Sequence, residues 1–106
     1  MPAMNFIITQ YQYDLRLTSS TTKVWMSLFT EDLCVAFALF LEQDTIPMAR
    51  LNPNDGKIWL YFKKNDLTNV LDLLRNEKPV HLHYMQDGFA TLSTQAEPVG
   101  VGDEQA

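Results

Sequence analysis

Two histidines, His81 and His83, are the first residues in this sequence whose spacing suggests chemistry. Residues i and i+2 of a strand lie on one face, so both imidazoles would point the same way. Metal sites use such pairs, but a protein zinc site needs three or four ligands and the sequence offers no clear third. We therefore expect no bound metal, and we interpret the pair as surface histidines on a polar strand face.

The single cysteine, Cys34, lies in the most apolar segment of the chain. Reactive thiols need electropositive, accessible surroundings, so we interpret Cys34 as a small core residue. The sequence shows no Ser-His-Asp pattern, no phosphate-binding glycine loop and no convincing pair of carboxylates. We expect a protein that is not an enzyme and holds no cofactor. The alternative enzyme would need groups assembled between subunits, such as His81 and His83 with a partner's carboxylate.

Basic and aromatic residues recur at alternate positions of the expected strands. In residues 57–62 (KIWLYF), Trp59 and Tyr61 share one face while Ile58, Leu60 and Phe62 share the other. We expect the apolar faces of these strands to pack against the helices. The opposite faces of the same strands then form a second surface, on the side of the sheet away from the helices. The candidate binding residues on it are Arg16, Lys23, Trp25, Arg50, Lys57, Trp59, Tyr61, His81 and His83.

An internal repeat appears when the chain is shifted so that Lys23 falls on Lys57. The segments 16–17, 23–26 and 32–33 then fall on 50–51, 57–60 and 66–67, with no gap. Fixed-offset similarity indicates a duplicated structural unit. We predict a strand-strand-helix unit that occurs twice, followed by a truncated copy with strands at 80–85 and 89–94.

The two expected helices differ in the quality of their pattern. The second has one apolar stripe, Leu67, Val70, Leu71 and Leu74. The first, over 30–41, is apolar nearly all round, which is also typical of a buried strand. The repeat favours a helix, with a stripe of Leu33, Phe37, Phe40 and Leu41.

These elements predict an α+β fold, an antiparallel sheet with two helices packed on one face in the order ββαββαββ. A ferredoxin-like variant over 23–85 is the alternative. A four-residue loop at 18–21 pairs Leu15 with Val24 and Arg16 with Lys23, and the equivalent register pairs Ala49 with Ile58 and Arg50 with Lys57. We expect a single domain over 1–98 and a disordered acidic tail over 99–106.

Charge and apolar surface indicate the location and the kind of partner to expect. The chain has 106 residues, a net charge of −5 and no run long enough to span a bilayer, so we expect a cytoplasmic protein without a membrane anchor. An apolar sheet face and an apolar first helix both need cover. We therefore expect a binding or assembly module that forms a homodimer or larger homo-oligomer, or binds another protein.

Single-stranded nucleic acid is the alternative partner, because aromatic side chains on a sheet stack bases while Lys and Arg follow the backbone. The segment 57–62 resembles the third-strand motif of RNA-recognition domains in its basic residue and its aromatics at the third and fifth places. It departs from that motif at Ile58 and Leu60, which replace glycine or alanine. The negative net charge also makes nucleic acid the less favoured partner.

Overall fold

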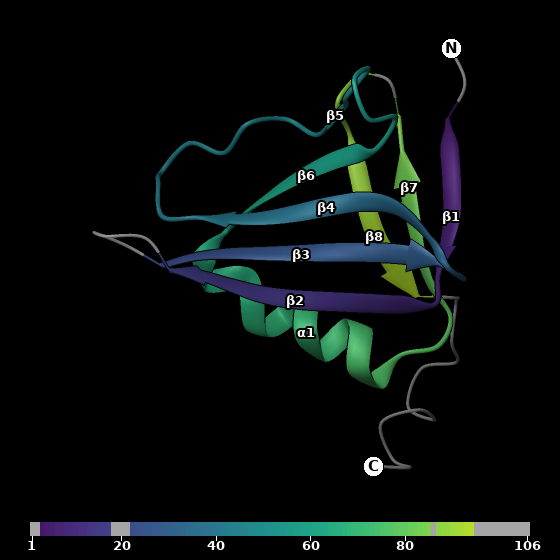
Figure 1. Ribbon diagram of the computed structural model, residues 1–106, viewed down its shortest axis with the longest axis horizontal. Coiled ribbons are helices and arrows are strands. Elements are labelled where there is room, and N and C mark those ends of the chain that lie inside the picture. The colour runs from purple at the N-terminus through teal and green to yellow at the C-terminus, as the bar shows by residue number, and fades with distance from the viewer. Residues whose placement is uncertain (1–2, 18–21, 86, 95–106) are drawn as a thin grey trace.

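The computed structural model describes residues 3–17, 22–85 and 87–94, and the predicted acidic tail lies outside them. The strands form two sheets rather than one (Figure 1). The five-stranded sheet has the order β2-β3-β4-β6-β5 and the three-stranded sheet has the order β1-β7-β8. The first comprises β2 (Gln10–Leu17), β3 (Thr22–Thr30), β4 (Leu33–Leu41), β6 (Ile58–Lys63) and β5 (Arg50–Leu51), and the second β1 (Met4–Ile8), β7 (Val80–Tyr84) and β8 (Ala90–Thr94).

The predicted fold class is therefore wrong, because the described residues contain one helical segment and two sheets. The 3-10 turn η1 (Lys64–Asp66) leads directly into the helix α1 (Leu67–Asn76), which confirms the second expected helix. The first expected helix is instead the strand β4. The aligned copies of the repeat thus adopt different structures, and the predicted duplication of a strand-strand-helix unit is wrong.

The all-apolar composition of residues 34–41 explains why β4 is a strand. It is hydrogen-bonded on both sides, between β3 and β6, so nearly every position contacts protein. Strands in such positions read as continuous apolar runs without alternation. The residues expected to begin a helix, Glu31 and Asp32, form the tight turn between β3 and β4, with Glu31 at φ 54°.

A β-bulge in β4 lets two consecutive residues enter the core. The register shifts between Leu28, which pairs with Ala36, and Phe29, which pairs with Cys34. Val35 is the extra residue, and both Val35 and Ala36 are buried. A bulge of this kind breaks the alternation of faces, which made the segment harder to read as a strand.

The chain passes from one sheet to the other at Thr9, between β1 and β2. Its backbone N–H donates to the Phe29 carbonyl at 2.8 Å, and its Oγ1 accepts from the Glu31 backbone N–H at 2.7 Å. The Thr30 hydroxyl donates to the Ile7 carbonyl at 2.9 Å. These bonds hold Thr9 against the β3–β4 turn. As a result β1 and β2, which are separated in the chain by Thr9 alone, belong to different sheets.

The strand registers confirm one prediction and correct another. Leu15 pairs with Val24 and Arg16 with Lys23, as expected. In the second hairpin, however, Leu51 pairs with Ile58 and Arg50 with Trp59, which is two residues away from the predicted register and therefore keeps the same faces together. The expectation of a wholly antiparallel sheet is also wrong, since β4 and β6 run parallel.

The hydrophobic core lies between the inner faces of the two sheets, with α1 against it. Val70 is the buried residue of α1, and Leu67, Leu71 and Leu74 pack beside it, as the stripe predicted. The inward residues of the central strands are fully or nearly fully buried: Val24, Met26, Leu28, Ala36, Ala38, Ile58, Leu60, Val80, Leu82 and Tyr84. Among the described residues, no helix has the length and apolar character needed to cross a membrane.

Candidate interaction surface

Three aromatic rings meet on the outer face of the five-stranded sheet. The centroids of Trp25 and Phe37 lie 5.4 Å apart, those of Phe37 and Trp59 5.4 Å, and those of Trp25 and Trp59 5.5 Å. The interplanar angles of 57°, 69° and 82° are tilted or edge-to-face. Such geometry directs the positive ring edges at the negative faces, so the three rings form one cohesive cluster.

The strand registers place these rings together. Phe37 of β4 is directly opposite Trp59 of β6, and Trp25 of β3 is diagonal to Phe37 because it pairs with Leu39. Leu39 in turn pairs with Tyr61. We call the set Trp25, Phe37, Leu39, Trp59 and Tyr61 the aromatic face.

Every side chain of the aromatic face is half-buried rather than buried. Their neighbours on the opposite side of the same strands, such as Met26, Ala38 and Ile58, are 0% exposed. Figure 1 shows β3 and β4 crossing in front of β8, and no described helix or strand lies across this outer side. The aromatic face is therefore an apolar sheet surface that the described part of the chain leaves open.

Arg50 and Asp55 border the aromatic face at Trp59. The Arg50 guanidinium lies 5.7 Å from the Trp59 ring centroid, within the range of a cation–π contact. The indole N–H of Trp59 donates to Asp55 Oδ2 at 3.1 Å. A cation and an anion thus hold the same indole at the edge of the sheet.

The turn between β5 and β6 fixes both neighbours of Trp59. The Asn52 N–H donates to the Lys57 carbonyl at 2.9 Å, and the Gly56 N–H donates to the Asn52 carbonyl at 2.8 Å. Gly56 has φ 72°, which favours glycine. This closed turn places Asn52 across from Lys57, so Arg50 falls opposite Trp59 and not opposite Lys57 as predicted.

Asp55 is held as a carboxylate by its neighbours. The Lys57 backbone N–H donates to its Oδ1 at 2.9 Å and lowers the pKa of Asp55 below its ordinary value. Partial desolvation acts in the opposite direction, while the Trp59 N–H bond and the Lys57 charge lower the pKa further. The negative charge therefore persists beside Trp59 at neutral pH.

The candidate residues divide between two surfaces. Trp25, Arg50, Trp59 and Tyr61 gather on the outer face of the five-stranded sheet. Lys57 lies in the turn just before β6, and Arg16 and Lys23 pair at one end of the β2–β3 hairpin. His81 and His83 belong to β7 in the other sheet, so the prediction that they line the same surface is wrong.

The two histidines are separated from the aromatic face because the core-facing side of β7 packs toward the other sheet. Val80, Leu82 and Tyr84 are buried there, so His81 and His83 face outward on the far side of the molecule. His83 Nδ1 contacts Asn5 Oδ1, and its Nε2 lies 3.3 Å from Met85 Sδ. The described residues contain no cluster of three metal-binding side chains.

Sequence reasoning missed Phe37 and Leu39, which contribute the middle of the aromatic face. Both were assigned to the expected first helix. Residues 34–41 are all apolar, so they show no alternation of polar and apolar positions that would have placed Phe37 and Leu39 on a strand face. Cys34 is partly buried, with its Sγ 3.7 Å from the Ala36 carbonyl oxygen.

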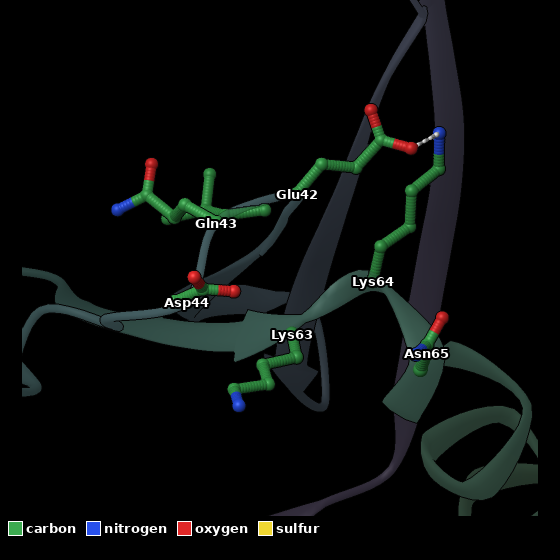
Figure 2. A pocket seen from close by; sticks show the side chains of 7 residues that line it. Glu42, Gln43, Asp44, Lys63, Lys64 and Asn65 are labelled. Carbon is green, nitrogen blue, oxygen red and sulfur yellow. Dashed lines mark hydrogen bonds and ion pairs between the residues drawn. The ribbon is translucent and has the colours of Figure 1, made fainter.

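A shallow polar hollow lies where the parallel strands β4 and β6 end. Figure 2 shows Lys64 turned toward Glu42, with their charged groups 3.4 Å apart, while Lys63 points the other way. The remaining lining residues are Leu41, Gln43, Asp44 and Asn65. Ligands often bind at the carboxyl ends of parallel strands. Here the opposite charges offset one another and the Glu42 side chain is 67% exposed, so the hollow has no convergent binding groups.

Comparisons of the chain with protein-family models, curated protein sequences and solved structures gave no match.

Proposed function

We propose that this protein is a non-enzymatic assembly module that forms a homodimer by packing the aromatic faces of two copies together. The observation that carries this proposal is the ring cluster of Trp25, Phe37 and Trp59 on an open sheet face. Isolated exposed apolar residues are ordinary, but a contiguous apolar patch marks an interaction site.

The composition of the face supports a protein partner. Protein interfaces are enriched in Trp, Tyr, Phe and Arg at their centres and are depleted in Lys and Glu. Trp25, Phe37, Trp59 and Tyr61 supply the aromatic centre, and Arg50 lies against Trp59 at the margin. Two sheets that pack face to face interdigitate their inner side chains, and a second copy brings an identical apolar sheet.

Single-stranded nucleic acid is the second candidate, favoured by the Arg50 guanidinium against the Trp59 ring. The ring geometry supports it less well. Bases stack on flat ring faces, whereas Trp25, Phe37 and Trp59 direct edges at one another. The Asp55 carboxylate beside Trp59 also repels phosphate.

Light scattering combined with tryptophan emission tests the proposal, because both tryptophans of the chain lie on the aromatic face. Phe37→Thr removes the central ring and keeps a residue with high strand propensity. We expect this variant to lower the assembly mass and to shift emission to the red. His81→Thr is the matched control, a half-buried outward position on β7, and is expected to change neither.

Two results contradict the homodimer. A monomeric wild-type chain at high protein concentration would exclude it directly. Emission that is quenched by a single-stranded oligonucleotide and recovers with added salt would instead favour the nucleic-acid candidate.

A further inference from the structure

The strand β2 has an open backbone edge. It pairs with β3 along its whole length, and it is the terminal strand of the five-stranded sheet. At eight residues it is the longest edge strand among the described residues, while β5 at the opposite edge has two. Long edge strands present unpaired N–H and C=O groups that can pair with another strand.

Two apolar side chains of β2 remain exposed although they share the core side of the sheet. Tyr13 is 38% exposed and Leu15 is 58% exposed. Their direct cross-strand partners, Met26 and Val24, are 0% and 3% exposed. The inward side chains are thus buried in β3 but exposed in β2. Exposed apolar surface therefore lies beside the unpaired backbone edge of the sheet.

The helix α1 approaches β2 near the start of the strand. Leu74 of α1 and Tyr11 line a common hollow at the Gln10 end. Tyr13 and Leu15, further along the strand, are exposed instead. The exposed apolar surface beside the open edge is therefore that of Tyr13 and Leu15.

We infer that β2 pairs with β2 of a second copy in an antiparallel arrangement, with Leu15 opposite Leu15 across a two-fold axis. This register sets Asp14 of each copy opposite Arg16 of the other, and it covers Tyr13 and Leu15. Opposite charges across a strand pair are stabilising, and like charges are destabilising. It also centres the pairing on the exposed Leu15, away from the hollow that Leu74 and Tyr11 line.

The neighbouring registers are less favourable. An axis at Asp14 sets Asp14 opposite Asp14, which places like charges together. An axis at Tyr13 sets Asp14 opposite Gln12 and Arg16 opposite Gln10, which pairs no opposite charges. That register also requires residues 10–12, beside the hollow lined by Leu74. Charge and access therefore select the axis at Leu15.

This inference goes beyond the proposed function because it concerns a different surface. Edge pairing joins two five-stranded sheets into one continuous sheet, whose two aromatic faces lie on the same side. A chain that carries both two-fold contacts forms an assembly larger than a dimer.

Disulfide trapping tests the register. In a Cys34→Ala background, Leu15→Cys places two thiols directly opposite each other, and antiparallel partners have Cα atoms about 4.5–5.5 Å apart. That separation suits a disulfide, so mild oxidation is expected to give a covalent dimer. Tyr13→Cys is the matched control, because its two copies are four residues out of register, roughly 13 Å along the strand. Cross-linking at Tyr13→Cys and not at Leu15→Cys would overturn the inference.

Charge reversal tests the pairing. Arg16→Asp is expected to weaken the edge contact by roughly tenfold to a hundredfold, since two attractive pairs become repulsive. Circular dichroism of the variant checks that the fold is kept. Adding Asp14→Arg restores opposite charges and is expected to recover the contact. Equal assembly of the wild type, the single variant and the double variant would refute the pairing.

The edge inference and the proposed function fail in distinguishable ways. Phe37→Thr removes the face contact and is expected to leave an edge dimer, whereas Arg16→Asp is expected to leave a face dimer. Both changes together are expected to give a monomer. A monomeric Phe37→Thr chain would overturn the edge inference, and a monomeric Arg16→Asp chain would overturn the proposed face contact.

Discussion

The indole N–H of Trp59 donates a hydrogen bond of 3.1 Å to Oδ2 of Asp55, four residues earlier in the chain. The other carboxylate oxygen accepts the backbone N–H of Lys57 at 2.9 Å. One exposed aspartate therefore closes the β5–β6 turn and also orients a tryptophan of the aromatic face. Turn geometry and the candidate interaction surface are linked through this side chain.

The first prediction concerns acid stability. The folded state lowers the pKa of Asp55, so its contribution to stability is present above the unfolded pKa of about 3.9 and is lost as the pH falls through the lowered folded value. Asp55→Asn is expected to remove this part of the acid dependence. The free energy of unfolding, measured by urea titration between pH 2 and pH 5, checks it.

Asp72→Asn provides the control for that experiment, because it removes the same charge from the exposed side of α1. It is expected to keep the wild-type acid dependence. If Asp55→Asn also keeps it, the hydrogen bonds to Lys57 and Trp59 contribute nothing to stability.

A second prediction concerns the shared core. Leu28 and Leu82 are both 0% exposed and come from the two different sheets. Leu28→Ala and Leu82→Ala are each expected to lower the free energy of unfolding by about 2–5 kcal/mol, because each leaves a cavity. Urea unfolding followed by circular dichroism and by tryptophan emission measures the loss.

The two probes should give one coincident transition in both variants, because one core joins the sheets. Separate transitions would mean that the sheets unfold independently. Leu33→Ala is the control, since Leu33 is 66% exposed and its removal is expected to change stability by at most about 0.5 kcal/mol.

A third prediction concerns the turn between β3 and β4. Glu31 has φ 54°, and it is the one non-glycine residue with positive φ in the described part of the chain. A left-handed conformation costs an L-residue roughly 1–2 kcal/mol, which glycine avoids at some cost in unfolded-state entropy. Glu31→Gly is therefore expected to raise the free energy of unfolding by about 0.5–1 kcal/mol in thermal or urea unfolding.

Asp32→Gly, at the neighbouring position of the same turn, is the matched control. It adds the same conformational entropy to the unfolded state but relieves no positive φ in the folded state. It is therefore expected to lower the free energy of unfolding. Equal effects of the two changes would show that the φ of Glu31 stores no strain.

Local patterns in the sequence determined several elements correctly. The alternation of Val24, Met26 and Leu28 identified the inner face of β3, and the stripe through Leu67, Val70 and Leu74 identified α1. These patterns are reliable because one side of each element faces the core and the other side does not. The short loop at 18–21 also predicted the β2–β3 register, since a hairpin register depends on loop length.

The aromatic face was only partly predictable, because some of its strands alternate between apolar and polar positions and β4 does not. Trp25, Trp59 and Tyr61 follow strand alternation and were placed on one face. Phe37 and Leu39 were missed, because β4 is enclosed by two neighbouring strands and its apolar run carries no period. His81 and His83 were misplaced, because alternation gives the face of a strand but not the sheet to which it belongs.

Tertiary structure decided the pairings between strands that no short hairpin loop connects. The sequence indicated strands, one helix and their inner faces, which depend on neighbours a few residues away. The division into two sheets at Thr9, the parallel pairing of β4 with β6 and the placement of Arg50 opposite Trp59 depend on contacts between distant segments and on the hydrogen bonds of the 52–57 turn. Such contacts leave no periodic signal in the chain, because each is made once, between residues far apart in sequence.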